Sequence, residues 1–108
     1  MRLVIIESPY AGDVEANLAY ARRCIRDSLA RGEAPIASHL LYTQPGILDD
    51  GDPEERQMGL EAGHAWYEAA ELCAVYEDRG ISHGMQDGII AAAARGVKIV
   101  FRTLEGRE

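Results

Sequence analysis

The segment RLVIIESPYAG, residues 2–12, decides how this sequence folds. Residues 2–6 form a short, nearly continuous apolar run with β-branched side chains, which is typical of a strand buried on both faces of a parallel sheet. Pro9 and Gly12 then favour a turn. We therefore expect a buried first strand, a loop that begins at Glu7-Ser8, and a helix directly after this loop.

Residues 13–30 have the pattern of an amphipathic helix. Asp13 is a suitable N-cap, and apolar side chains recur every three or four residues, as one buried helix face requires. The apolar positions are Val14, Leu18, Ala21, Ile25 and Leu29. Gly32 lies just beyond the last of them and is a typical helix terminator.

Strands and helices alternate along the rest of the chain. Strand composition is found in residues 34–38 (APIAS), 71–76 (ELCAVY) and 97–101 (VKIVF). Between them, Asp52-Pro53 is a strong helix start, and Ser82 can cap a helix that ends near Arg95. The helix from residue 53 is expected to place four residues on one face: Met58, Ala62, Trp66 and Ala69.

This β-α-β-α-β-α-β order predicts an α/β fold, a three-layer Rossmann- or flavodoxin-like domain with a four- to five-stranded parallel sheet. The length of 108 residues predicts a single domain over residues 1–108. A strand order of 2-1-3-4 is expected. Because the core of such a domain is small, we expect a homo-oligomer, with Tyr42, Trp66 and the second helix at its interface.

Composition excludes several classes of partner. The formal net charge is −7, and because nucleic-acid backbones attract basic surfaces, duplex nucleic acid is not expected to bind. Cys24 and Cys73 have no metal-binding spacing and are expected to be reduced core thiols of a cytoplasmic protein. No leader or membrane-spanning run is found. The three histidines lack metal spacing, so neither a metal nor a cofactor is expected.

The strand order predicts where a ligand binds. In open parallel sheets, ligands bind at the carboxyl ends of strands, where the strand order reverses. Here the reversal lies between the first and third strands, so the loops of residues 7–12 and 77–85 should meet there. Each loop leads into a helix N-terminus with free N–H donors. Ser38 and His39, which follow the second strand, should lie beside them.

The ligand-binding candidates come from these loops and the turns next to them. They are Ser8, Pro9, Tyr10, Ala11, Gly12, Asn17, His39, Arg79, Ser82, Gly84 and Met85. Arg79 is suited to a carboxylate or phosphate, whereas Ser82 is first of all a helix cap. His64 is interpreted as an ordinary helix residue, and the acidic residues 49–55 as a solvated loop and helix cap.

At these loops the sequence resembles the nucleoside 2-deoxyribosyltransferase-like superfamily, in particular its short phage and bacterial members. The resemblance covers most of the chain. It is carried by residues 2–12, Asn17, Tyr20, residues 35–39, residues 80–85 and residues 97–102. It implies a flavodoxin-like, usually oligomeric domain that handles the N-glycosidic bonds of nucleosides or nucleotides.

The sequence departs from this superfamily at the catalytic position. The resemblance implies a glutamate nucleophile four residues beyond Gly84, but that position is Gly88, which has no side chain. Asp87 is adjacent, turned about 100° around the helix. Glu7 is the first residue past a buried strand and is placed to point into the site. Asp87 and Glu7 are therefore the catalytic candidates.

Three functions stay open from the sequence. The first is a protein that binds a nucleoside- or nucleotide-like ligand and, in a phage, sequesters a nucleotide signal. The second is an N-glycosidic-bond hydrolase or deoxyribosyltransferase that uses Asp87 or Glu7, with His39 or Tyr10 assisting. The third is a protein-interaction module with a vestigial pocket.

Overall fold

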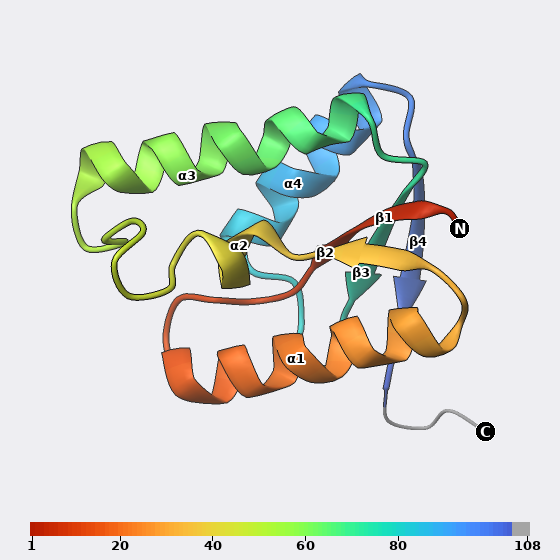
Figure 1. The fold of residues 1–108 in the computed structure, drawn as a ribbon, viewed down its shortest axis with the longest axis horizontal. Helices are drawn as coiled ribbons and strands as arrows, with labels where there is room; N and C mark the ends of the chain where they lie inside the picture. Colours follow the sequence, from red (N-terminus) through yellow and green to blue (C-terminus); the bar gives the residue numbers. More distant parts are fainter. Residues whose placement is uncertain (105–108) are drawn as a thin grey trace.

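The computed structural model describes residues 1–104 and has a four-stranded parallel sheet between helices (Figure 1). The predicted fold class and the strand order β2-β1-β3-β4 are confirmed. In chain order, the elements are β1 (Leu3–Glu7), α1 (Val14–Ala30), β2 (Ala34–Ile36), α2 (Ser38–Leu41), α3 (Pro53–Ala65), the 3₁₀ turn η1 (Trp66–Glu68), β3 (Leu72–Tyr76), α4 (His83–Ala94) and β4 (Lys98–Arg102).

The sheet has a core on each of its faces. Val4 and Ile6 of β1 face α1, where they pack with Tyr20 and Cys24. Ile5 faces the opposite side. The second core lies beneath η1 and α4 and contains Tyr67, Cys73, Val75, Met85 and Ala92. Because β1 and β3 lie in the middle of the sheet, they are the most buried strands, as their apolar sequences predict.

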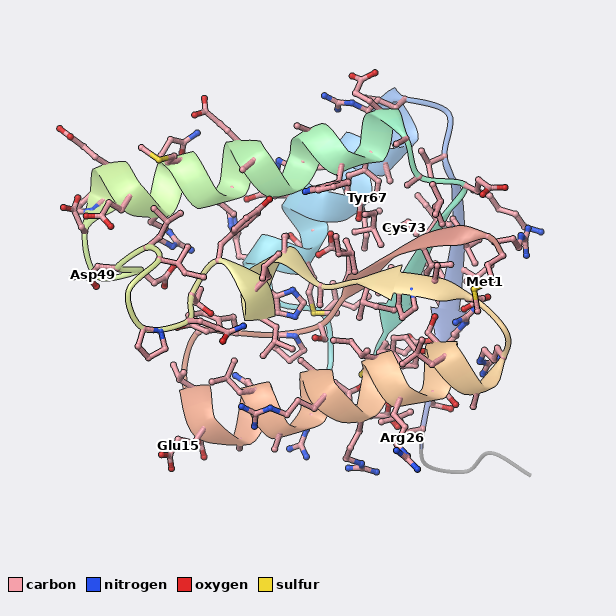
Figure 2. All side chains as sticks on the ribbon, viewed as in Figure 1. Met1, Glu15, Arg26, Asp49, Tyr67 and Cys73 are labelled. Carbon is pink, nitrogen blue, oxygen red and sulfur yellow. The ribbon has the colours of Figure 1, made fainter. Side chains whose placement is uncertain are left out.

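The two cysteines lie on different sides of the sheet. Cys24 and Cys73 are both free and fully buried, and each belongs to a separate core. Figure 2 shows Cys73 near Tyr67 on the α3–α4 side, while Arg26 projects from the outer surface of α1. None of the described helices combines the length and apolar character needed to cross a membrane.

The cap of α1 is confirmed, but its predicted buried face is only partly correct: Ala21 is buried and Ile25 packs against the core, and the other predicted positions are more exposed. Asp13 accepts a hydrogen bond from the backbone N–H of Ala16, whereas Leu29 is 52% exposed. The buried positions are Asn17, Tyr20, Ala21, Cys24, Asp27 and Ser28. Three of these residues are polar, so a stripe defined by apolar residues alone is rotated away from the centre of the buried face.

The segment between β2 and β3 also differs from its prediction. Strand β2 ends at Ile36, and Ser38 begins the short helix α2 instead of extending the strand. Helix α3 begins at Pro53 with Asp52 as its cap, as predicted. However, it ends at Ala65, so Trp66 and Ala69 cannot share a face with Met58. Met58 and Trp66 are 57% and 43% exposed.

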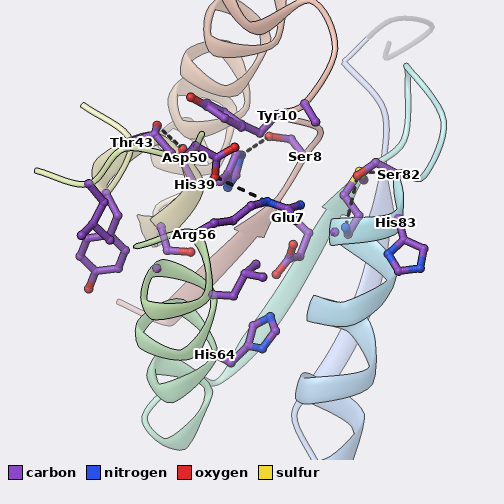
Figure 3. Close-up of a pocket in the computed structure, with 18 of the residues that line it drawn as sticks. Glu7, Ser8, Tyr10, His39, Thr43, Asp50, Arg56, His64, Ser82 and His83 are labelled. Carbon is purple, nitrogen blue, oxygen red and sulfur yellow. Dashed lines mark hydrogen bonds and ion pairs between the residues drawn. The ribbon is translucent and has the colours of Figure 1, made fainter. Parts of the chain in front are cut away.

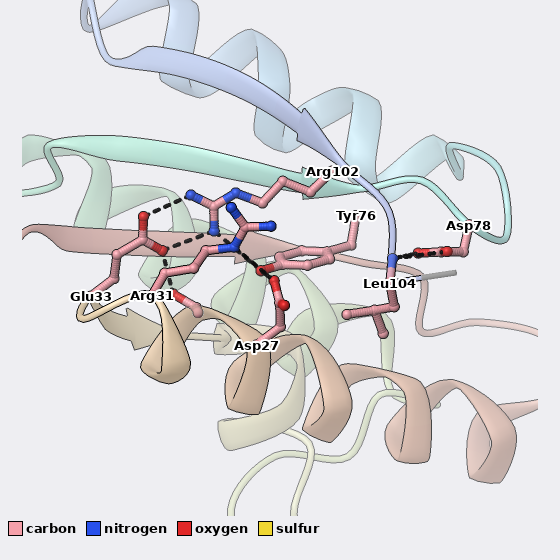
Figure 4. Close-up of polar contacts among 8 residues, drawn as sticks. Asp27, Arg31, Glu33, Tyr76, Asp78, Arg102 and Leu104 are labelled. Carbon is pink, nitrogen blue, oxygen red and sulfur yellow. Dashed lines mark hydrogen bonds and ion pairs between the residues drawn. The ribbon is translucent and has the colours of Figure 1, made fainter. Parts of the chain in front are cut away.

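A buried polar cluster connects β4 to the segment between α1 and β2 (Figure 4). The Arg102 guanidinium donates to both carboxylate oxygens of Glu33, at 2.8 and 2.7 Å, and to the hydroxyl of Tyr76 at 3.1 Å. The Tyr76 hydroxyl in turn donates to Asp27 at 2.7 Å. These hydrogen bonds connect α1 and the segment after it to strands β3 and β4.

Candidate functional site

A cavity of about 180 Å³ opens at the carboxyl edge of the sheet (Figure 3). It is enclosed by the loop after β1, by α2 and the loop that follows it, by α3, and by the N-terminus of α4. The loops after β1 and β3 thus meet at one cavity, beside the place where the strand order reverses. Parallel sheets bind their ligands at such an edge.

Glu7, the last residue of β1, brings a carboxyl group into this cavity. The hydroxyl of Tyr67 donates to Glu7 Oε2 at 2.6 Å. Burial raises the pKa of Glu7 to about 7, although the Tyr67 hydrogen bond lowers it; the negative charge of Asp87 raises it further. Near neutral pH the cavity therefore holds a carboxyl group that gains and loses its proton readily.

Gly88 of α4 leaves the space that the Glu7 carboxyl group occupies. Gly88 is buried, and a methyl group added to its Cα would overlap both carboxylate oxygens of Glu7. The Glu7 carboxyl group can therefore occupy this position only because residue 88 has no side chain. No side chain larger than hydrogen fits at residue 88 while Glu7 keeps this position.

Gly88→Ala should therefore destabilise the protein by about 1–3 kcal/mol, because the added methyl group overpacks a buried site. Gly84→Ala on the same helix is the matched control. A Cβ at Gly84 has no neighbour within 4 Å, so alanine there should be neutral or stabilise by about 0.5–1 kcal/mol. Urea unfolding followed by circular dichroism measures both; equal effects would contradict the packing argument.

Ser8 and His39 form a hydrogen-bonded pair in the cavity wall. Ser8 Oγ lies 2.6 Å from His39 Nε2, and Ser8 is 4% exposed. The hydroxyl of Thr43 donates to the backbone oxygen of His39 at 2.6 Å, which fixes the start of the next loop. Burial lowers the pKa of His39 to about 4, so its ring is neutral at neutral pH.

The N-terminus of α4 forms the opposite wall. Ser82 Oγ accepts a hydrogen bond from the backbone N–H of Met85 at 3.2 Å, so Ser82 caps the helix as predicted. Its own N–H donates to Met85 Sδ at 3.4 Å. The space around Gly84 is open. This wall thus presents the positive end of a helix dipole to the cavity.

Not every candidate residue lies in the cavity wall. The candidates that line it are Glu7, Ser8, Tyr10, Ala11, His39, Ser82, Gly84 and Met85. Pro9 and Gly12 belong to the same loop but are not part of the lining. Asn17 supports that loop from behind, because its amide donates to the backbone oxygens of Tyr10 and Ala11 at 3.0 and 3.1 Å.

Arg79 and Asp87 point elsewhere. The Arg79 guanidinium lies 4.9 Å from the centre of the Tyr20 ring, outside the cavity. The side chain of Asp87 is 44% exposed, and its carboxylate lies 3.8 Å from His83 Nδ1 at the surface. Of the two catalytic candidates, Glu7 lines the cavity and Asp87 does not.

Sequence reasoning missed the wall that the loop after α2 and helix α3 contribute. The residues concerned are Tyr42, Thr43, Leu48, Asp50, Glu55, Arg56, Gly59, Leu60 and His64. Ser38 and His83, which come from segments expected near the site, also line the cavity. Tyr42 was expected at an oligomer interface and His64 in an ordinary helix position. One signal was available: Gly59 and Gly63, one turn apart in α3, mark the face where α3 packs closely on Leu48 and Ser38.

A second, more open hollow adjoins the cavity. It measures about 720 Å³, and the two share Tyr10, Thr43, Leu48, Asp50 and Glu55. Arg56 Nε lies 3.7 Å from Asp50 Oδ1 at the boundary between them. In residues 1–104, no group of three or more His, Cys, Asp or Glu residues is placed to hold a metal ion.

Comparison with solved structures places the fold among 2-deoxyribosyltransferases. The chain is similar to the 2-deoxyribosyltransferase of Bacillus psychrosaccharolyticus, with a TM-score of 0.66 and 15% identity over 98% of this chain and 75% of that one. It is also similar to the 2-desoxiribosyltransferase of Leishmania mexicana, with a TM-score of 0.61 and 14% identity over 99% of this chain and 67% of that one. At these identities the likeness concerns the fold.

Sequence comparison assigns the family. No curated protein matches the chain. A family model described as a domain of unknown function, DUF7768, matches residues 2–102. This match spans every strand and helix of the described fold and the loops after β1 and β3. The chain therefore belongs to the DUF7768 family.

Proposed function

We propose that this protein binds a nucleoside- or nucleotide-like molecule in the cavity at the carboxyl edge of its sheet. The observation that carries the proposal is the convergence of the loop after β1 and the N-terminus of α4 on one cavity. This is the ligand position of open parallel sheets. The fold shared with 2-deoxyribosyltransferases supports a nucleoside as the core of the ligand.

The size of the two spaces suggests how such a ligand sits. The cavity, about 180 Å³, is smaller than typical small-molecule pockets, which begin at about 300 Å³. It therefore suits one part of a nucleoside, the sugar or the base. The remaining part would extend into the adjoining hollow across Tyr10 and Leu48, which line both spaces.

The polar groups of the wall suit a ligand with hydroxyl groups. Ser8 and the neutral ring of His39 offer a donor and an acceptor without net charge. Among the described residues, Arg56 is the only arginine or lysine in the lining, and its guanidinium lies near Asp50. A phosphate group would therefore depend mainly on the backbone N–H groups at the start of α4.

A single incubation tests the proposal. The purified protein is mixed with nucleosides, nucleotides, cyclic dinucleotides and ADP-ribose derivatives, and the free and protein-bound fractions are analysed by liquid chromatography and mass spectrometry. We expect one class of compound to be retained. A nucleotide that returns intact on denaturation would also fit sequestration of a nucleotide signal, as in a phage. No retention of any compound would contradict the proposal and favour a protein-interaction module.

Ser8→Ala combined with Ser82→Gly should weaken binding of the retained compound by about tenfold to a hundredfold. Each hydroxyl is worth about 1 kcal/mol as a hydrogen-bonding group, and each 1.4 kcal/mol changes affinity by about tenfold. Glycine is chosen at Ser82 because it replaces a capping serine at a cost of only a few tenths of a kcal/mol. Isothermal titration calorimetry measures the affinity.

Thr103→Ala is the control for this experiment. It removes an exposed hydroxyl group outside the lining of the cavity and should leave the affinity unchanged. If the double variant binds as tightly as the wild type, the ligand does not use the wall formed by Ser8 and Ser82.

A further inference from the structure

Among residues 1–104, the glutamates Glu33 and Glu7 are both largely buried, and their surroundings are opposite in kind. Glu33 is paired with the Arg102 guanidinium through two hydrogen bonds, and this pairing lowers its pKa. Glu7 has no cationic partner among the described residues; its hydrogen-bond donor is the neutral hydroxyl of Tyr67. A buried carboxyl group without a cation is costly, and such groups cluster at functional sites.

The position of Glu7 suits reaction with a ligand. Its carboxyl group ends the central strand β1 and lines the cavity. The Tyr67 hydroxyl donates its hydrogen bond to Oε2 of Glu7. Oε1 of Glu7 has no hydrogen-bond donor within the described residues and is available to a ligand or a water molecule. Gly88 on α4 leaves this volume free for a carboxyl group that comes from the opposite wall.

We propose that Glu7 is the catalytic general base of this cavity, held in the space that Gly88 vacates, and that it hydrolyses the N-glycosidic bond of a bound nucleoside. This inference rests on the proposed nucleoside site. Tyr67 is a positioning residue, because its hydrogen bond holds Glu7 Oε2 while Oε1 reacts. Asp87, at the surface beside His83, takes no part in the reaction.

The step balances with water as the only co-reactant. The Glu7 carboxylate takes a proton from a water molecule, and the water oxygen forms a bond to the anomeric carbon of the sugar. The bond from this carbon to the base nitrogen breaks, and its electron pair stays on the nitrogen. The proton held by Glu7 then passes to the base through solvent. Nucleoside and water thus give free sugar and free base, and Glu7 is regenerated.

Glu7→Gln tests the assignment with little change of shape. The purified protein is incubated with a panel of ribo- and deoxyribonucleosides; free base is measured by chromatography, and nucleoside retention is measured separately. We expect retention within a few-fold of wild type and a loss of base release of about hundredfold or more. Wild-type base release should rise with pH, with a midpoint near 7, because the base must be ionised.

An exchange of positions tests the role of Gly88. Glu7→Ala removes the carboxyl group, and Glu7→Ala/Gly88→Glu returns one to the same volume from α4. We expect the double variant to release base at least tenfold faster than Glu7→Ala. Glu61→Gln, which changes an exposed carboxyl group on α3, is the control and should release base at the wild-type rate.

The outcomes separate this inference from the proposed function. A wild-type protein that retains nucleoside but releases no base overturns the role of Glu7 alone, and the site is then a binding site. Loss of base release in Asp87→Asn but not in Glu7→Gln also overturns it. A glycosyl group found covalently on Glu7 by mass spectrometry overturns the general-base role. A protein that neither retains nor cleaves any nucleoside overturns both proposals.

Discussion

Arg102→Met should reduce the free energy of unfolding by about 3–5 kcal/mol. The side chains of Arg102 and Glu33 are only 9% and 8% exposed, and the Arg102 guanidinium donates hydrogen bonds to both carboxylate oxygens of Glu33. Methionine fills a similar volume but leaves Glu33 as a buried charge with the hydroxyl of Ser28 as its remaining donor. The cost is therefore the desolvation of an uncompensated carboxylate, which is larger than the loss of one hydrogen bond.

Two comparison variants separate this effect from a general effect of removing an arginine. Arg95→Met breaks the ion pair with Glu68, whose side chain is 72% exposed, and should cost less than about 1 kcal/mol. Arg102→Met/Glu33→Leu removes both charges and should recover most of the lost stability. Urea unfolding at neutral pH measures all three proteins. A loss below 1 kcal/mol in Arg102→Met would contradict the buried-pair argument.

Glu7→Gln should become progressively more stable than the wild type as the pH rises from 4.5 to about 7. In the unfolded chain Glu7 loses its proton near its ordinary pKa of 4.5, whereas in the folded protein it keeps the proton until about 7. Between these values the folded state binds more protons, so wild-type stability falls as the pH rises. The slope is about 1.4 kcal/mol per pH unit, and the total is about 3 kcal/mol.

The difference between the two proteins isolates Glu7 from the other titrating groups. His39 acts in the opposite direction: its folded pKa of about 4 lies below the ordinary 6.5, so stability is lost as the pH falls between these values. This contribution is common to both proteins and cancels in the difference. Tyr67, which faces Glu7 from η1, stays protonated throughout, because burial raises its pKa. Asp87 of α4, whose negative charge raises the pKa of Glu7, is likewise present in both proteins.

Thermal or urea unfolding at half-unit pH steps measures this difference. Glu61→Gln is the matched control, because it removes an exposed carboxyl group and should follow the wild-type curve at every pH. A difference between Glu7→Gln and wild type that stays constant from pH 4.5 to 7 would show that the Glu7 carboxyl group is solvated, contrary to its position beside Tyr67 and Gly88.

Local signals predicted most of the elements because they act over a few residues. Asp13, Asp52 and Ser82 are caps in the structure, since a cap needs only its own side chain and the next backbone N–H groups. The buried face of α1 could not be found in the same way. Asn17 and Asp27 are buried because their partners, the backbone of Tyr10 and the hydroxyl of Tyr76, come from other elements.

The same distinction applies to the cavity. The loops after β1 and β3 were predicted to meet, because parallel strands bring their carboxyl ends to one edge, and Ser8 and Ser82 do line one cavity. The wall from α3 was not predicted. Its position depends on where the long segment after β2 packs, and the close approach of Gly63 to Ser38 is a long-range contact.

The sequence by itself determined the alternating order of strands and helices, the helix caps and the loops that carry the site, because hydrophobic period, capping and chain crossover follow from local pattern and chirality. It also showed that residue 88 lacks a side chain. Only the tertiary structure decided that the Glu7 carboxyl group lies in that space, hydrogen-bonded to Tyr67 and without an ion pair to any described arginine. Burial, pKa and shared volume depend on how elements distant in the sequence pack together, and no local pattern contains that information.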